Sequence, residues 1–279
     1  MTVVSAWVRR TQLGAEELVI ASDSRLSGYG SLDCSPKIIQ LPRSDSLIAY
    51  SGDTFFAYPV IHQITEAIRG NRSIHERIKD YGAFRNYVLK IMNEMYSFFH
   101  GAPKELKNPD TGFILAGYSW FKKEFMIDVI SFRKGSKRFE HRPVGDFFGR
   151  GKVCFTGDMG KEGFRRLRQA LLEKYGSPRA DESGDVMGYL NMEPFEVIRD
   201  MLREANENTA SIGGAPQVVT VAQHMNSRQT AIYWPSRESG KIFLGGAPVV
   251  DLNYLDNWIM DPDTLEKSHL HYRSHGQRE

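Results

Sequence analysis

The chain has 279 residues, of which 41% are hydrophobic, enough to bury a substantial core as one domain or two small ones. Its 36 basic and 34 acidic residues are mixed along the chain and leave a formal net charge of +2, which argues against a nucleic-acid or membrane-surface partner. The two cysteines are too few for a disulfide framework and lack the spacing of a thiolate metal site.

The sequence carries no visible signal for export or membrane insertion. The first ten residues lack a basic lead, an apolar run of signal-peptide length and a cleavage box. No stretch elsewhere approaches the roughly 20 consecutive apolar residues that cross a bilayer. We therefore expect a soluble, cytoplasmic protein, and we expect neither a metal nor a cofactor.

The first fifty residues predict strands without a helix. A β-rich run and a second short apolar run flank a turn at Gly14, which indicates a hairpin. A loop containing Gly28, Gly30 and Pro36 leads to two more apolar runs. The predicted strands are 3–8, 17–21, 37–41 and 47–50.

After these strands, helices and strands alternate in groups. Apolar residues that recur every three or four positions are typical of helices with one buried face, and shorter β-rich runs are typical of strands. The predicted helices are 54–69, 84–98, 164–175 and 193–206, and the predicted strands are 112–120, 125–132, 138–142, 153–156, 217–223 and 230–234.

The helices are too few to separate every pair of strands. This argues against a doubly wound parallel sheet and predicts an α+β fold in which antiparallel sheets stack between helical layers. We expect one domain over 2–235. Periodicity is weak after it, so 236–279 is predicted to be a C-terminal extension, ordered around Tyr254 to Ile259 and frayed at its end.

Thr2 is the first candidate for chemistry. A threonine hydroxyl is a poor nucleophile that needs a base held against it. A free α-amino group, with a pKa of about 7.7 to 8.0, is such a base and belongs to the same residue once Met1 is removed. Met1 precedes a small residue, the context in which the initiator methionine is usually trimmed. On position alone, Thr2 is more simply the first residue of an edge strand.

Two charged residues change that interpretation when they are taken together. Asp23 closes the second predicted strand, where a solvent-facing or turn-capping role would explain it, and Lys37 opens the third, where it could be an exposed edge lysine. Both precede a turn of small residues, 51–54, that opens a helix. This joint pattern seldom arises by chance.

At these positions the sequence resembles the proteasome β-subunit and bacterial proteasome-like protease family, a group of N-terminal nucleophile hydrolases. The motifs that match in order are Thr2-Val3-Val4, Ala21-Ser22-Asp23-Ser24-Arg25, Lys37-Ile38-Ile39 and Ile48-Ala49-Tyr50-Ser51-Gly52-Asp53-Thr54. Two later segments match more loosely: Thr156-Gly157-Asp158-Met159-Gly160 and Asn208-Thr209-Ala210-Ser211-Ile212-Gly213-Gly214. The resemblance covers about residues 2 to 235.

The resemblance implies a four-layer αββα sandwich, with two antiparallel sheets between helical layers, and it implies roles by position. Thr2 would attack a carbonyl, with its own amine as the proton acceptor. Lys37 would add positive charge beside Thr2, and Asp23 would hold Lys37 charged and oriented. The Gly52 N–H would stabilise the oxyanion, with Ser51 as the alternative one residue earlier.

Further positions follow from the same resemblance. Ser211 would hydrogen-bond the α-amine, and Arg25 belongs to the matched motif. Asn208 stands where the family has an aspartate. Thr156 or Asp158 replaces a family serine, and either residue could instead be a plain helix N-cap.

The implied function is a threonine peptidase or related amidohydrolase that acts on a peptide or protein through an acyl-enzyme. The implied assembly is a homo-oligomer, with an ATP-dependent unfoldase as a possible partner. The alternative is a catalytically inactive scaffold or assembly subunit with the same fold. Asn208 and the altered turn at 156–160 favour this alternative.

Overall fold

The computed structural model describes residues 2–11, 14–28, 30–100, 109–176, 189–205, 211–251 and 255–269. They form a mixed α+β fold built on two larger sheets, which confirms the predicted class. Apart from one parallel pair, between β12 (Ser227–Tyr233) and β15 (Ile259–Met260), the paired strands in this part of the chain are antiparallel. None of the helices among these residues has the length and apolar character required to span a bilayer.

The first sheet has the N-terminal hairpin near its centre. This hairpin consists of β1 (Val4–Arg10) and β2 (Glu16–Ser22). Besides β12 and β15, the sheet contains β10 (Val153–Thr156), β11 (Gln217–Ala222), β13 (Ile242–Leu244), β14 (Ala247–Pro248) and β16 (Lys267–Ser268). The order is β10-β1-β2-β11-β12-β13-β14, with β15 and β16 attached beside β12. Val4 lies opposite Ser22 on one side and Thr156 on the other. The start of β1 and the ends of β2 and β10 therefore lie side by side at one end of the strands.

The second sheet has the order β5-β6-β7-β8-β9. Its strands are β5 (Ile38–Gln40), β6 (Ser46–Gly52), β7 (Thr111–Ser119), β8 (Glu124–Arg133) and β9 (Arg138–Pro143). Every strand predicted from an apolar run corresponds to a strand in one of the two sheets. The short pair β3 (Leu26–Ser27) and β4 (Ser31–Leu32) was not predicted, because two-residue strands leave no periodic pattern.

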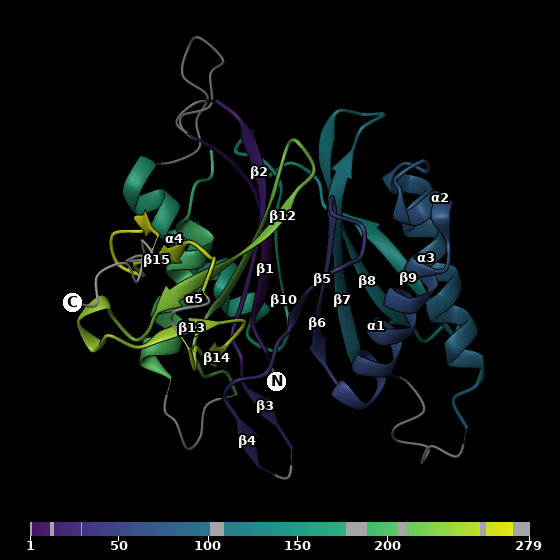
Figure 1. Ribbon diagram of the computed structural model, residues 1–279, viewed down its shortest axis with the longest axis horizontal. Helices are drawn as coiled ribbons and strands as arrows, with labels where there is room; N and C mark the ends of the chain where they lie inside the picture. Colours follow the sequence, from purple (N-terminus) through teal and green to yellow (C-terminus); the bar gives the residue numbers. More distant parts are fainter. Residues whose placement is uncertain are drawn as a thin grey trace, which may run out of the picture.

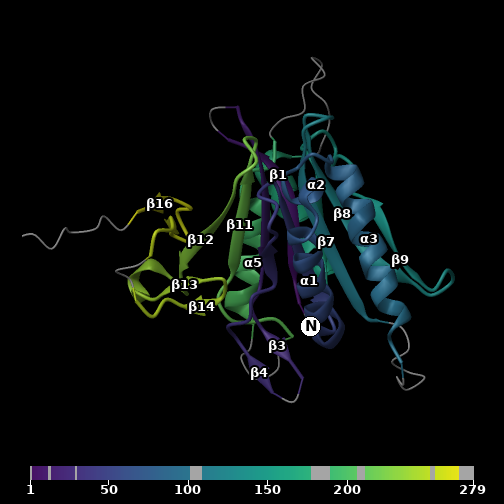
Figure 2. The ribbon, with the colours of Figure 1, turned by 45° about the vertical axis from the view of Figure 1, so that its right-hand side comes forward.

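The helices lie on the outer faces of the two sheets, and the sheets face each other (Figure 1). The helices are α1 (Thr54–Arg69), α2 (Arg72–His75), α3 (Tyr81–Ser97), α4 (Gly160–Tyr175) and α5 (Glu193–Glu204). Apolar side chains from both sheets fill the space between them, among them Ala6, Ile20, Ala49 and Ile114. Separate clusters join α1 and α3 to the second sheet and α4 and α5 to the first, an arrangement that is also visible in Figure 2.

Helix α1 follows directly on β6 and fixes the turn between them. The Asp53 carboxylate accepts a hydrogen bond from the Phe55 N–H at 2.9 Å, which satisfies one of the free donors at the start of the helix. Phe56, Val60 and Ile64 lie on its buried face. The residues just before this helix therefore have a defined position at the end of the sheet.

The outer edge of β9 is closed by a side chain from α3. Asn93 Oδ1 accepts a hydrogen bond from the Phe139 N–H at 2.7 Å, and Asn93 Nδ2 donates to the Phe139 carbonyl at 3.1 Å. Pro143, the last residue of the strand, has no N–H to offer. Free backbone groups on an edge strand can pair with a strand of another chain. On β9 the N–H and carbonyl of Phe139 are already hydrogen-bonded to Asn93.

The segment after residue 235 continues the first sheet in its described part. β13 pairs with β12 in antiparallel fashion, and β15 pairs with β12 in parallel. The division into a domain over 2–235 and an extension stays a prediction. Tyr254 and the end of the chain lie outside the described residues.

Replacement of Asp45 by alanine tests a buried ion pair that supports the second sheet. Arg43 and Asp45 are fully buried and bound through two hydrogen bonds of 2.8 and 3.0 Å. Asp45→Ala leaves a buried charge without its partner, so the free energy of unfolding should fall by about 3–5 kcal/mol in denaturant titrations. Glu66→Ala, which breaks the exposed pair with Arg69, should cost at most about 1 kcal/mol; equal losses would contradict this account.

Candidate active site

The N-terminal hairpin brings Thr2 and Asp23 to the same end of the first sheet. Thr2 comes two residues before β1, and Asp23 directly follows β2, whose last residue lies opposite Val4. The Asp23 N–H donates to the Val3 carbonyl at 3.3 Å, which extends the pairing by one step. Residues that are 21 positions apart in sequence thereby become neighbours.

Lys37 connects these two residues from the opposite sheet. It directly precedes β5, and its Nζ donates to Thr2 Oγ1 at 2.8 Å and to Asp23 Oδ1 at 2.9 Å. The side chains of Lys37 and Asp23 are fully buried, and Thr2 is 2% exposed. This burial excludes a solvent-facing aspartate and an exposed edge lysine, the two simpler interpretations of these positions.

The Asp23 carboxylate is surrounded by further donors. Oδ1 accepts from the Val3 N–H at 3.1 Å, and Oδ2 accepts from the N–H groups of Arg25 and Gly213 at 3.2 and 3.4 Å. Burial raises the pKa of Asp23 and lowers the pKa of Lys37, because desolvation disfavours the charged form of each group. The attraction between the two groups opposes both shifts. The close contact of the two groups and the backbone donors thus favour the charged forms against this desolvation.

Gln217, the first residue of β11, holds the backbone around this pair and was missed by sequence reasoning. Its Oε1 accepts from the Lys37 N–H at 3.0 Å, and its Nε2 donates to the carbonyls of Asp23 and Ser35 at 3.2 and 2.7 Å. Gln217 is 1% exposed. A polar residue that opens an otherwise apolar strand was the one available signal. Gln217 is a positioning residue, because it acts on the backbone of the charged pair.

Arg25 stabilises the segment that follows Asp23. Its Nε and Nη2 donate to the Asp33 carboxylate at 2.6 and 2.7 Å, and this hydrogen bonding lowers the pKa of Asp33. The guanidinium lies against Gly213, where an added Cβ would come within 2.5 Å of Arg25 Cζ. Because residue 213 has no side chain, Arg25 can pack against the backbone segment that donates to Asp23.

On its other side, Thr2 meets the turn before α4. The Thr2 N–H donates to Asp158 Oδ2 at 3.1 Å. The N-cap of α4 is Met159, without a side-chain hydrogen bond, so neither Thr156 nor Asp158 serves as the N-cap residue. Of the two candidates at this turn, the structure brings Asp158 to Thr2, while Thr156 pairs with Val4 at the end of β10.

Two glycines permit close approach of the backbone, one at Thr2 and one at the end of β6. Gly157 has a φ of +90°, and an added Cβ would lie 2.1 Å from the Thr2 carbonyl oxygen and 3.4 Å from Ser51 Cβ, so Thr2 and Ser51 flank this glycine. Gly52 has a φ of +93°, and an added Cβ would lie 1.9 Å from the Asp110 carbonyl oxygen. Both positions need glycine for conformation and for space.

The segment that was predicted to contact the Thr2 amine is described only in part. Asn208 lies outside the described residues. Ser211 is half-buried two positions before Gly213, so its segment reaches the site, but within the described chain no hydrogen bond joins Ser211 to Thr2. The role of Ser211 stays a prediction.

No protein-family model matches the chain, and no curated protein matches it either. Membership of the proteasome-like family therefore stays a prediction from the motifs. The geometry itself supplies a hydroxyl that accepts a hydrogen bond from a buried ammonium, a carboxylate that orients this ammonium, and a second carboxylate at the threonine nitrogen. Such an arrangement suits the activation of a hydroxyl nucleophile.

Gly157→Ala and Gly14→Ala form a matched pair that tests the packing at Thr2. Both glycines have positive φ, so each alanine should cost about 1–2 kcal/mol of unfolding free energy from the left-handed backbone alone. No other atom lies within 4 Å of a Cβ added at Gly14, whereas the one at Gly157 overlaps the Thr2 carbonyl. Chemical denaturation should show a clearly larger loss for Gly157→Ala; equal losses would show that the turn does not press on Thr2.

Proposed function

We propose that this chain is an N-terminal threonine hydrolase that cleaves peptide or amide bonds through an acyl-enzyme on Thr2, once Met1 has been removed. The observation that carries the proposal is the pair of hydrogen bonds by which Lys37 Nζ joins Thr2 Oγ1 to Asp23 inside the protein. A buried ammonium is expensive to maintain, and its contact with the Thr2 hydroxyl suits the activation of that hydroxyl as a nucleophile.

The proposed reaction uses groups of Thr2 itself. The α-amine accepts the proton of Oγ1 while Oγ1 attacks the substrate carbonyl, and the Gly52 N–H stabilises the resulting oxyanion. The carbon–nitrogen bond then breaks, and the leaving amine takes the proton from the α-ammonium. Water attacks the ester on Oγ1 in the same way and releases the acid. Lys37 stays charged throughout and favours the alkoxide character of Oγ1.

The architecture supports the same proposal. Two mainly antiparallel sheets face each other with helices on both outer faces, the arrangement that the family resemblance implies. The site lies where the first residues of the chain meet the opposite sheet. We extend the proposal to a peptide or protein substrate and to a homo-oligomeric, proteasome-like assembly.

A non-catalytic scaffold of the same fold is the second candidate. The observation in its favour is that Thr2 is 2% exposed and that its nitrogen is an amide as long as Met1 is attached. In this alternative, the lysine and the two carboxylates would anchor the chain start and would not activate it.

Replacement of the threonine hydroxyl distinguishes the two candidates. Thr2→Ala should lower hydrolysis of fluorogenic peptides by at least about 1,000-fold, because it removes the nucleophile, whereas Thr2→Ser keeps a hydroxyl and should retain activity. Thr65→Ala, a threonine on α1 whose hydroxyl bonds to Ile61, is the matched control and should behave like the wild type. Intact-mass analysis must first show that Met1 is absent in the protein assayed.

An electrophile that reacts with N-terminal threonine provides the complementary measurement. Stoichiometric labelling at Thr2 in the trimmed protein, absent in Thr2→Ala, is the expected result. A trimmed protein that neither hydrolyses peptides nor takes up the label would establish the scaffold in place of the enzyme.

The pH dependence should respond to Asp158. Its carboxylate accepts from the Thr2 nitrogen, and in the trimmed protein a negative charge at this place favours the ammonium form of the amine. Asp158→Asn removes this negative charge, so the unprotonated amine should appear at lower pH, and the acidic limb of kcat/KM should shift to lower pH. A shift to higher pH, or no shift, would show that the amine is not the base.

A further inference from the structure

An open groove lies between α3 and the edge strand β9, which run side by side in Figure 2. Its volume is about 480 Å³, and its lining comprises residues 138–141 of β9 and one stripe of α3 that contains Asn86, Leu89, Lys90 and Asn93. Lys37 precedes β5, the opposite edge of the same sheet, about 19 Å away at about 4.8 Å per strand. The groove is thus separate from the proposed active site.

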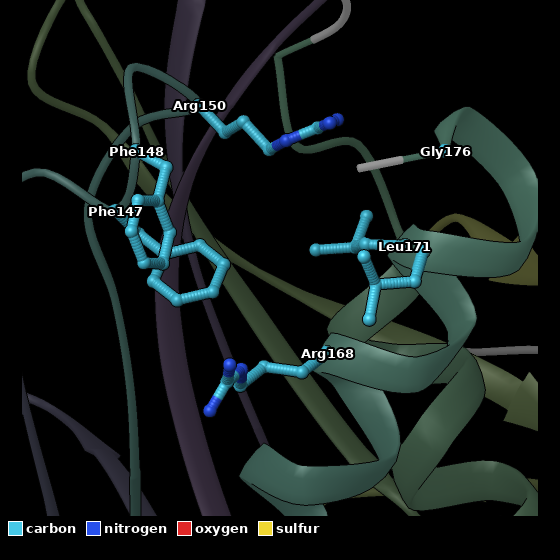
Figure 3. Close-up of a pocket in the computed structure, with 7 residues that line it drawn as sticks. Phe147, Phe148, Arg150, Arg168, Leu171 and Gly176 are labelled. Atoms are coloured by element: carbon cyan, nitrogen blue, oxygen red, sulfur yellow. The ribbon is translucent and has the colours of Figure 1, made fainter. Parts of the chain in front are cut away.

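The size of this groove suits a small organic ligand. Ligand sites commonly enclose about 300–1,000 Å³, and the groove falls in this range. The apolar pocket beside α4 has only about 60 Å³, well below the roughly 150 Å³ of a cavity that holds benzene (Figure 3). The groove at β9 therefore has room for a ligand that the pocket beside α4 lacks.

His141 is held at the groove by a buried carboxylate. Its Nδ1 lies 2.8 Å from Oδ1 of Asp128, whose side chain is fully buried. Tyr81 donates to the other oxygen of Asp128 at 2.9 Å, and Arg85 lies 3.8 Å from Oδ1. An ionised carboxylate only accepts, so Nδ1 carries a proton and Nε2 is the ring atom left for a ligand. In the imidazolium form, Nε2 donates and adds a positive charge.

The side-chain acceptors of Asn93 and Glu140 are engaged within the protein. The Asn93 amide is bound to the main chain of Phe139 through both its oxygen and its nitrogen. Glu140 accepts from Ser136 Oγ at 2.8 Å and from Arg138 Nε at 3.2 Å. Strand alternation also places Glu140 on the face of β9 opposite to the histidine. The one acidic residue of the lining is therefore paired and turned away from α3.

Two residues of α3 supply donors to the same groove. Lys90 is exposed and forms no ion pair with any of the residues that the structure describes. Asn86 Oδ1 accepts from Arg85 Nη2 at 3.1 Å, which leaves the Asn86 Nδ2 as a donor. The two residues are four positions apart and lie on the same side of the helix. Together with His141 they make the groove rich in donors and positive charge, which favours an anion.

We infer that this groove binds a phosphate monoester, with its phosphoryl group on Asn86, Lys90 and His141. A phosphoryl group has three terminal oxygens that accept strong hydrogen bonds, one for each of these donors. An ammonium group is a common phosphate ligand, because the hydrogen bond is charge-assisted. The remaining volume accommodates the organic part of the ester. This inference does not depend on the proposed hydrolysis.

Ribose 5-phosphate and ribose test the inference, because they differ only in the phosphoryl group. In calorimetric titrations of the full chain at about pH 6, where an ordinary histidine is largely charged, ribose 5-phosphate should bind saturably. Ribose should bind at least about tenfold more weakly, since the charge-assisted contacts are lost. Inorganic phosphate should bind with an affinity between the two. Absence of saturable binding, or equal affinity for ribose, would overturn the inference, and tighter binding of inorganic phosphate would overturn the assignment of an ester.

Variants locate the binding. Lys90→Ala should weaken the binding of ribose 5-phosphate by at least about tenfold, and Asn86→Ala, which removes a neutral donor, should weaken it less. His141→Gln removes the third donor and should weaken it as well. Lys161→Ala, at an exposed position of α4, changes the net charge by the same amount as Lys90→Ala and should leave the affinity unchanged. Asn86 and Lys90 are exposed, so their variants should fold. Binding that survives both of these α3 substitutions would place the ligand elsewhere and refute the assignment.

Discussion

The contact between a fully buried lysine and a fully buried aspartate is the interaction on which the arrangement of the candidate site depends. Desolvation of each ion costs several kcal/mol, and only close contact and additional hydrogen bonds offset it. The chain supplies these from separate places: Val3 and Arg25 beside the hairpin, and Gly213 from the loop before β11. The segments that carry these groups must therefore converge on one point.

This convergence also ties the two sheets together. Thr2 and Asp23 adjoin strands of the first sheet, Lys37 directly precedes a strand of the second, and the apolar layer between the sheets sets their separation. Gln217 adds a second link, because it sits on the first sheet and accepts from the Lys37 backbone. The position of the ammonium relative to the threonine is thus a property of the whole packing and not of one loop.

The sequence predicted the elements well and the site in part. Apolar periodicity identifies strands and helices because it reflects which face is buried. The order of Thr2, Asp23 and Lys37 indicated a shared location, and in the structure these three side chains are in contact through Lys37. Gln217 escaped prediction because a single buried glutamine has no periodic signature. The choice between Thr156 and Asp158 also required coordinates, since it depends on the direction of two neighbouring side chains at one turn.

The amide of Asn93 on the rim of β9 bears on how copies of this protein can associate. Its oxygen and nitrogen occupy the main-chain groups of Phe139 that a neighbouring strand would otherwise use, and Pro143 contributes no donor farther along. Growth of the second sheet from molecule to molecule, the route towards fibrils, is obstructed at this rim. An ordered assembly that forms through other surfaces of the molecule would not depend on extension of the second sheet at β9, so its geometry would be set by the shape of those surfaces.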